Sequence, residues 1–273
     1  MQPLTEQQIY LFQETVWTHG KELYRDMPWR QNTDPYWVLV SEIMLQQTQV
    51  DRVVPKFHAF IGRFPSTTDL AAAPLADVLQ LWSGLGYNRR AKFLHEAAKM
   101  ICTDFKGVFP HTQADLVRLP GVGVNTAGAI MAYSFNEPVV YIETNVRTVY
   151  FHHFFTDDEA VSDVAIREYA AQTVDREHPR EWYWAVMDYG SFLKKQGAGA
   201  NSKSRHYKKQ TPLKGSVREV RGQILKELTA AGVGSLAALE VRYADDERLP
   251  RALEGLQVDK LIIIEGDTVQ LAR

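Results

Sequence analysis

The chain has 273 residues, of which 45% are hydrophobic and 23% charged, and its formal net charge is −2. This composition is typical of a water-soluble globular protein with two or three domains, and it excludes a globally basic nucleic-acid-binding protein, so any positive surface must be local. The single cysteine excludes a disulfide framework, a four-cysteine iron–sulfur cluster and a cysteine-based zinc finger within one chain. The first ten residues do not resemble a signal peptide, and the longest apolar runs are too short to span a membrane.

Apolar side chains recur with helical spacing along the first 193 residues, where strand signals are nearly absent. Thr5 and Gln8 have the spacing of a capping box at the start of the first helix. The segment Met27 to Arg30 breaks that first pattern, and a glycine-rich turn at residues 83–86 ends a later one. The spacing predicts an all-helical body, with helices over residues 5–19, 35–48, 51–62, 69–72, 74–82, 89–105, 113–119, 126–135, 146–155, 163–174 and 181–192.

The composition changes after residue 193. Residues 194–215 carry seven lysines and arginines and no acidic side chain, which indicates a basic loop or linker, either with an electrostatic role or merely solvated. Beyond it, the pattern predicts helices over residues 217–229 and 245–253, a short helix capped by Ser235 between them, and two strands within residues 260–272. Three helices followed by a hairpin are the order of a winged helix.

The most informative local sequence is Leu119 to Ala127, which reads Leu-Pro-Gly-Val-Gly-Val-Asn-Thr-Ala between two predicted helices. We expect Gly121 and Gly123 to supply the positive φ angles of a tight hairpin. The helix that begins near Asn125 adds unpaired N–H groups and a positive dipole end, so the turn is suited to hold a phosphate oxygen. Glu143 follows shortly afterwards and could act on whatever this site holds.

Several stretches together resemble one family. The string Glu-x-Met-Leu-Gln-Gln-Thr-Gln within residues 36–50, the segment 81–87 and the hairpin 119–130 closely resemble the MutY-type adenine DNA glycosylases of the helix-hairpin-helix (HhH-GPD) superfamily, and residues 187–190 match more weakly. The resemblance covers about residues 1–193. It implies an all-α fold of two helical lobes, residues 31–135 with the hairpin, and residues 1–30 with 136–193. Residues 194–215 then replace the iron–sulfur loop, and 216–273 form a small winged-helix-like α+β domain.

The resemblance also implies a mechanism in which a nucleotide is flipped out of the duplex and its N-glycosidic bond is hydrolysed. Such a reaction needs one protonated carboxyl group for the departing purine and one ionised carboxylate for the sugar cation. Glu42 matches the family's general acid, Glu143 matches its carboxylate, and Asn145 matches the neighbouring asparagine. The family usually has aspartate at position 143, so the longer side chain is a departure. A solvated Glu42 and a helix-terminal Glu143 without catalytic roles are the alternatives.

The same resemblance assigns DNA contacts. Gln46, Gln47 and Tyr87 match residues that enter the minor groove and fill the space of the flipped base. For Tyr87 ordinary packing is the alternative. Arg89 is expected to contact phosphate, as are Arg90 and Lys92 beside it, and the remaining predicted DNA-binding residues are Gly121, Gly123, Asn125, Thr126 and Arg147.

Asn125 stands where bifunctional glycosylase-lyases carry a lysine, and an amide cannot form a Schiff base. We therefore expect a monofunctional enzyme. Lys194 stands where the first cluster cysteine would be, so no iron–sulfur cluster and no other cofactor is expected, and no histidine spacing indicates a metal site. The C-terminal part does not resemble the Nudix-like domain with which these enzymes recognise 8-oxoguanine.

The sequence thus predicts a monofunctional DNA glycosylase of base excision repair that removes mispaired adenine. One alternative is the same fold acting on another damaged or mismatched base, whether deaminated, alkylated or oxidised, and another is a non-catalytic DNA-structure-binding protein. The expected partner is double-stranded DNA with a lesion or mismatch. We expect a cytoplasmic monomer, associated with the nucleoid in a prokaryote, and no membrane partner.

Overall fold

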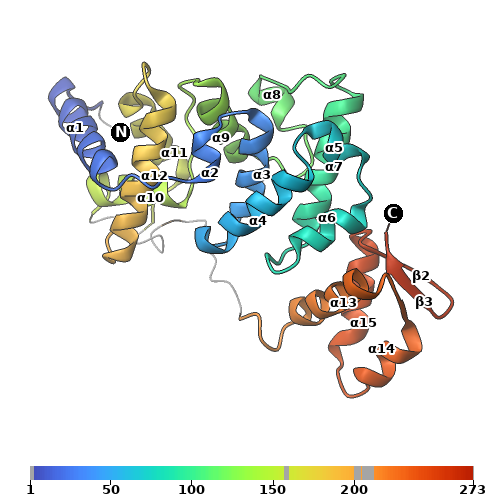
Figure 1. Cartoon of the computed structure of the whole chain (residues 1–273). Coiled ribbons are helices and arrows are strands. Elements are labelled where there is room, and N and C mark those ends of the chain that lie inside the picture. Colours follow the sequence, from blue (N-terminus) through green and yellow to red (C-terminus); the bar gives the residue numbers. More distant parts are fainter. Residues whose placement is uncertain (1–2, 157–159, 200–203, 205–211, 273) are drawn as a thin grey trace. The chain divides into compact units, whose positions relative to one another are not determined.

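The computed structural model describes residues 3–156, 160–199, 204 and 212–272 (Figure 1). The elements up to residue 195 are all helical. They are α1 (Glu6–Glu22), α2 (Pro28–Gln31), α3 (Pro35–Leu45), α4 (Val50–Arg63), α5 (Thr67–Ala72), α6 (Leu75–Trp82), α7 (Arg89–Thr103), α8 (Gln113–Leu116), α9 (Val124–Phe135), α10 (Thr144–Phe154), α11 (Asp163–Thr173) and α12 (Pro179–Lys195). The C-terminal elements are α13 (Val217–Ala231), β1 (Val233–Ser235), α14 (Leu236–Arg242), α15 (Arg248–Val258), β2 (Ile262–Glu265) and β3 (Thr268–Leu271). In the described part of the chain, no helix is both long and apolar enough to cross a membrane.

The described residues fall into two compact units. Unit 1 takes them from Met1–Glu42, Pro110–Arg118 and Val122–Lys209, and unit 2 from Ile43–Phe109, Leu119–Gly121 and Gln210–Arg273. The boundaries of these units differ from those of the lobes expected from the sequence. Helix α9 packs on α12 and so belongs to unit 1, and α13 packs on α6 and so belongs to unit 2. The predicted lobe boundaries stay a prediction.

Unit 1 is built around α12, which packs against α1, α9 and α10, while α11 packs against α1 and α10. Thr5 and Gln8 form the expected capping box at the start of α1. Ring contacts fill the core: the ring centroid of Phe12 lies 5.3 Å from that of Tyr150 and 6.1 Å from that of Trp182. Burial of such large apolar side chains is the main source of stability for these helices.

A buried ion-pair triad holds α12 to the segment that precedes α3. Asp188 is only 2% exposed. Its Oδ1 accepts hydrogen bonds from Arg25 Nε (2.6 Å) and Arg30 Nη2 (3.0 Å), and its Oδ2 from Arg30 Nη1 (2.7 Å) and Arg25 N (3.2 Å). Because every partner is charged or a backbone donor, the carboxylate is fully satisfied away from water.

Unit 2 contains α4 to α7 together with the C-terminal domain. The C-terminal sheet has the order β1-β3-β2 and is antiparallel, with Gly234 opposite Val269 and Ile263 opposite Gln270. Helix α13 packs against α15, the sheet and α6. The element order and the sheet confirm the all-α fold with a small winged-helix-like domain. Strand β1 was not expected, because three residues with no alternating pattern give no strand signal by themselves.

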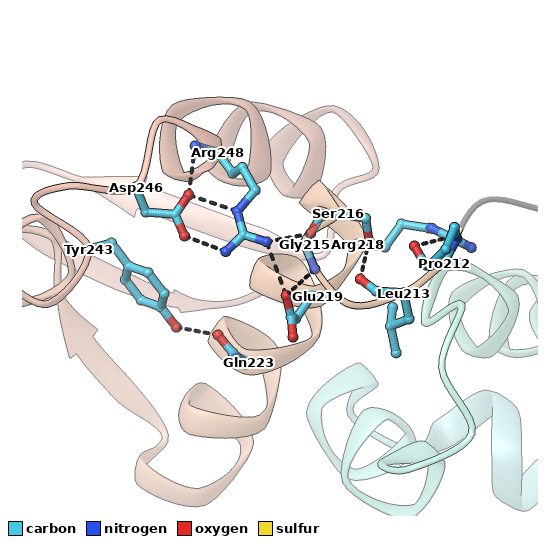
Figure 2. A network of polar contacts seen from close by, with 10 residues as sticks. All are labelled: Pro212, Leu213, Gly215, Ser216, Arg218, Glu219, Gln223, Tyr243, Asp246 and Arg248. Atoms are coloured by element: carbon cyan, nitrogen blue, oxygen red, sulfur yellow. Dashed lines mark hydrogen bonds and ion pairs between the residues drawn. The ribbon is translucent and has the colours of Figure 1, made fainter.

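Polar contacts organise the first half of the C-terminal domain (Figure 2). The guanidinium group of Arg248 pairs with Asp246 (Nη2 to Oδ2, 2.7 Å) and with Glu219 of α13 (Nη1 to Oε2, 3.0 Å). Glu219 Oε2 also accepts from Gly215 N at 2.9 Å. Ser235 caps α14 as expected, its Oγ accepting from Ala238 N at 3.1 Å. Residues 200–203 and 205–211, half of the predicted basic segment 194–215, lie outside the described residues.

Candidate active site and nucleic-acid interface

Glu42 lies on α3, whose neighbouring residues Leu39, Ile43 and Met44 are fully buried apolar side chains. Burial raises the pKa of Glu42 well above its usual value, and the negative charge of Glu143 raises this pKa further. A carboxyl group whose pKa is raised in this way keeps its proton to a higher pH than an exposed glutamate and can serve as a general acid. The carboxyl group is therefore chemically suited to the predicted role.

Glu143 occupies the N-cap position of α10, with extended backbone angles of φ −105° and ψ 175°. Its side chain makes no capping hydrogen bond to α10, so its carboxylate is not used to terminate the helix. Burial raises the pKa of Glu143, and the positive charge of Arg147 one turn later opposes this rise. Of the two carboxyl groups, Glu42 is the one that holds the proton and Glu143 the one that ionises more readily.

Two buried tyrosines accompany the carboxyl pair, and sequence reasoning did not single them out. Tyr133 of α9 and Tyr141, which precedes α10, have ring centroids 6.3 Å apart. Burial raises the pKa of both phenols well above the usual value, and the charges of Glu42 and Glu143 add to that rise. Both phenols therefore stay neutral and keep a proton to donate. The only sequence signal was a tyrosine within the otherwise apolar helix 126–135.

The two asparagines predicted for this region have different surroundings. Asn125 Oδ1 accepts hydrogen bonds from Ile142 N (3.2 Å) and Arg167 Nη2 (3.3 Å), so its side chain supports the backbone directly before Glu143. Asn145 lies on the first turn of α10, close against α12: a Cβ atom at Gly190 would stand 2.4 Å from Asn145 O. Gly190 thus permits the close approach of α10 and α12 at Asn145, two residues after Glu143.

The two hairpin glycines, Gly121 and Gly123, have different backbone conformations. Gly121 has the expected positive φ of +80°, and an added Cβ would stand 2.9 Å from the Cβ of Phe93. Gly123 was expected to share that conformation, which is wrong: its φ is −89° because it is the N-cap of α9 and N-caps adopt extended backbone. No described atom lies within 4 Å of a Cβ built at Gly123, which leaves the backbone open to a close approach from outside.

The first turn of α9 offers the donors expected of a phosphate site. Ala127 N–H donates the first intrahelical bond to Gly123 O at 2.9 Å, so the N–H groups of Val124, Asn125 and Thr126 precede the hydrogen-bond ladder of the helix. Thr126 is buried, with 8% of the residue exposed, whereas Gly123 and Val124 at the start of the turn are exposed. These donors begin a helix of twelve residues, which contributes its dipole.

Gln47 and Tyr87, two residues predicted to enter the duplex, both have left-handed backbone conformations, with φ of 56° and 49°. Such angles are strained for residues with a side chain and concentrate at functional sites. Both side chains are exposed, Tyr87 by 37%. Gln46 is half-buried, and its Nε2 donates to Gly121 O at 3.3 Å, which ties it to the hairpin turn.

Some of the side chains predicted to contact phosphate are exposed, and others are already paired with protein groups. Arg89 is 60% exposed and lies 3.5 Å from Asp259 (Nε to Oδ1). Arg147 makes a bidentate pair with Asp163, with Nε–Oδ1 2.9 Å and Nη2–Oδ2 2.7 Å. Lys92 pairs with Glu96 at 2.6 Å. Arg90 is buried and bonded to protein carbonyl groups, so the expectation that it contacts phosphate is wrong.

The donor set does not fit an iron–sulfur cluster, because the whole chain supplies a single thiolate, that of Cys102 on α7. Within the described ranges, no group of three or more histidine, cysteine, aspartate or glutamate side chains could hold a metal ion.

Comparison with known proteins agrees with this fold. The family described as the HhH-GPD superfamily of base excision DNA repair proteins matches residues 40–175. An adenine DNA glycosylase of Mycobacterium tuberculosis strain H37Rv is 34% identical over 261 residues, covering 88% of this chain and 86% of the relative. One from Buchnera aphidicola subsp. Baizongia pistaciae is 34% identical over 191 residues, covering 67% of this chain and 53% of the relative. The chain thus spans about half the length of the Buchnera relative.

Among solved structures, a thermostable thymine-DNA glycosylase superposes with a TM-score of 0.61 at 25% identity, covering 68% of this chain and 87% of the other. The chain therefore belongs to the HhH-GPD superfamily of base excision DNA repair proteins, in the group of its relatives that are named adenine DNA glycosylases.

Proposed function

We propose that this chain is a monofunctional DNA glycosylase that flips a mispaired adenine out of duplex DNA and hydrolyses its N-glycosidic bond. The observation that carries the proposal is the pair of carboxyl groups whose pKa values are raised to different extents, Glu42 more than Glu143. A purine leaves as an anion unless it is protonated, and the sugar develops positive charge as the bond breaks. One neutral and one ionised carboxyl group answer these two needs.

In the proposed reaction, Glu42 gives its proton to the purine as the bond between the purine nitrogen and C1′ of the sugar breaks. The Glu143 carboxylate stabilises the positive sugar and takes a proton from water as the water oxygen bonds to C1′. Asn145, next to Glu143 on the first turn of α10, orients the carboxylate and the sugar–phosphate group. The neutral phenols of Tyr133 and Tyr141 provide buried hydrogen-bond donors close to both carboxyl groups.

The absence of a lysine at position 125 supports hydrolysis without strand cleavage. The Asn125 amide cannot form a Schiff base, and its Oδ1 is engaged by Ile142 N and Arg167 Nη2. We also propose that the enzyme works without an iron–sulfur cluster, since one cysteine cannot supply four ligands. Iron analysis of the purified protein, together with its visible absorbance, tests this part directly.

Duplex DNA is the proposed partner. The turn at Gly121 and Gly123 with the first turn of α9 holds one phosphate group. Gln46, Gln47 and Tyr87 probe the duplex from the minor groove, and the exposed Arg89 contacts the backbone. The acidic Asp246 of the C-terminal domain is already paired with Arg248, so it presents less negative charge to DNA than its sequence suggests.

A single-turnover base-release assay tests the proposal. The duplexes carry adenine opposite 8-oxoguanine, guanine or cytosine, and further duplexes carry uracil, thymine, hypoxanthine or an alkylated purine. We expect release of adenine opposite 8-oxoguanine or guanine, its loss in Glu42→Gln and Glu143→Gln, and wild-type rates in the exposed control Glu137→Gln. Release of another base alone would move the substrate to the alternative lesions, and no release from any duplex would favour a DNA-binding protein without catalysis.

A further inference from the structure

Arg90, the second residue of α7, has a guanidinium group that connects two loops distant in sequence. Its side chain is buried although it carries a charge, the whole residue being 8% exposed. Nη1 donates to Ile43 O and Met44 O, both at 2.9 Å, and to Gln46 O. Nη2 donates to Thr48 Oγ1 and Gly86 O, both at 3.0 Å, and more weakly to Leu85 O at 3.4 Å. Nη1 therefore bonds the end of α3 and the loop that follows it, and Nη2 bonds both loops.

The acceptors explain why a charge is stable at this position. Ile43 O and Met44 O belong to the last turn of α3, where carbonyl groups lack intrahelical partners and the helix dipole favours a cation. The guanidinium carbon also lies 5.4 Å from the ring centroids of both Trp82 and Tyr87. A buried cation bonded to this many protein acceptors stabilises the local structure and is not available to contact phosphate.

Each of the two loops that Arg90 joins carries a residue with a left-handed backbone conformation. Gln47 (φ 56°) follows Gln46 in the loop from α3 to α4, and Tyr87 (φ 49°) follows Gly86 in the loop from α6 to α7. A left-handed backbone at a residue with a side chain persists only where its surroundings determine it. Arg90 bonds the carbonyl group directly before each of these residues, Gln46 O and Gly86 O.

We propose that Arg90 is a positioning residue for DNA probing: its guanidinium group holds Gln47 and Tyr87 in their strained conformations and at a fixed separation, so that both side chains enter the duplex together. This inference rests on the proposed function of these loops. Lysine cannot replace arginine here, because its compact ammonium group has three donors and cannot reach acceptors in both loops with a planar fork.

The test compares Arg90→Lys with Arg63→Lys, a matched control at an exposed arginine of α4 whose ion pair with Asp77 is at the surface. Each variant is assayed on two duplexes. In the first, the target adenine is mispaired and must be extruded, and in the second it lies in a single-nucleotide bulge and is already unstacked. Rates are normalised to the active fraction by titration, and folding is checked by circular dichroism.

We expect Arg90→Lys to slow excision from the mispair on the order of 10²-fold, as for a probing group displaced by roughly 1 Å, and to leave excision from the bulge close to the wild-type rate. Arg63→Lys should match wild type on both duplexes. Equal losses on both duplexes would overturn the proposal, because damage to the fold or the carboxyl pair slows both alike, and so would the absence of any loss. If Arg90→Lys does not fold, Thr48→Val, which removes one acceptor and leaves the cation, should show the same selective loss at several-fold size.

A second readout separates this inference from the proposed chemistry. With 2-aminopurine beside the target position, wild-type protein should raise the fluorescence on binding as the stack opens, and Arg90→Lys should not at equal occupancy. If wild type releases no base but still opens the stack in an Arg90-dependent way, the proposed function fails and the positioning role stands. If wild type does not open the stack, the positioning role fails whatever base is released.

Discussion

Glu143→Asp is the most informative single substitution, because the MutY-type glycosylases that this chain resembles usually have aspartate where it has glutamate. The change removes one methylene group and retracts the carboxylate by about 1.5 Å, the length of one C–C bond. In this structure Glu143 has an extended backbone and makes no capping bond to α10. Its side chain is thus not held at the helix end, and its charge acts on the buried phenols of Tyr133 and Tyr141.

A retraction of this size predicts a loss on the order of 10²-fold in the single-turnover rate of base release, or about 2.7 kcal/mol in activation free energy. The same change should stabilise the fold. Aspartate is a strong N-cap residue, so the shorter carboxylate can accept from the first turn of α10, a gain on the order of 1 kcal/mol. Lower activity combined with a higher melting temperature is a signature that simple damage to the fold does not produce.

The assay is single-turnover base release from the best duplex of the panel, with thermal unfolding measured on the same preparations. Glu137→Asp, the same change at an exposed position, is the control and should alter neither quantity. A Glu143→Asp rate equal to or above the wild-type rate would refute the reasoning, since it would show that the position of this carboxylate tolerates the family's shorter side chain without loss.

Three further predictions concern carboxyl groups. Asp188→Asn removes the negative charge that pairs with Arg25 and Arg30, and it should lower the free energy of unfolding by about 3–5 kcal/mol. For a chain of this size, the melting temperature should fall by roughly 6–20 °C. A loss below about 1 kcal/mol in urea unfolding would show that the triad contributes little. Glu42→Gln should abolish base release yet stabilise the fold at neutral pH. Because the folded-state pKa of Glu42 lies above the ordinary value of 4.5, the unfolded chain releases this proton first, and wild-type stability falls as pH rises from 4.5 to the folded-state pKa. The advantage of Glu42→Gln should therefore vanish below pH 4.5, and an advantage that persists there would have another cause. Wild-type base release should decline at high pH as Glu42 ionises and at low pH as Glu143 is protonated.

The sequence by itself was sufficient for features that depend on local residue order. Helical spacing predicts nearly every helix, Gly121 has the positive φ that its turn requires, and Ser235 caps the helix that it precedes. The succession of helices and a final hairpin predicts the winged-helix-like domain. Backbone preferences and turn chemistry act over a few residues, so they can be read without knowing what the chain packs against.

Other features were decided only by the tertiary structure. Burial raises the pKa of both Glu42 and Glu143, but the charge of Glu143, distant in sequence, raises the pKa of Glu42 further, whereas the charge of Arg147 opposes the rise at Glu143. Arg90 looks like a surface cation beside Arg89, yet its side chain is buried because the ends of two loops converge on it and supply carbonyl acceptors. Solvation and hydrogen-bond partners depend on the whole packed chain, whereas residue spacing records only the order in which the groups occur.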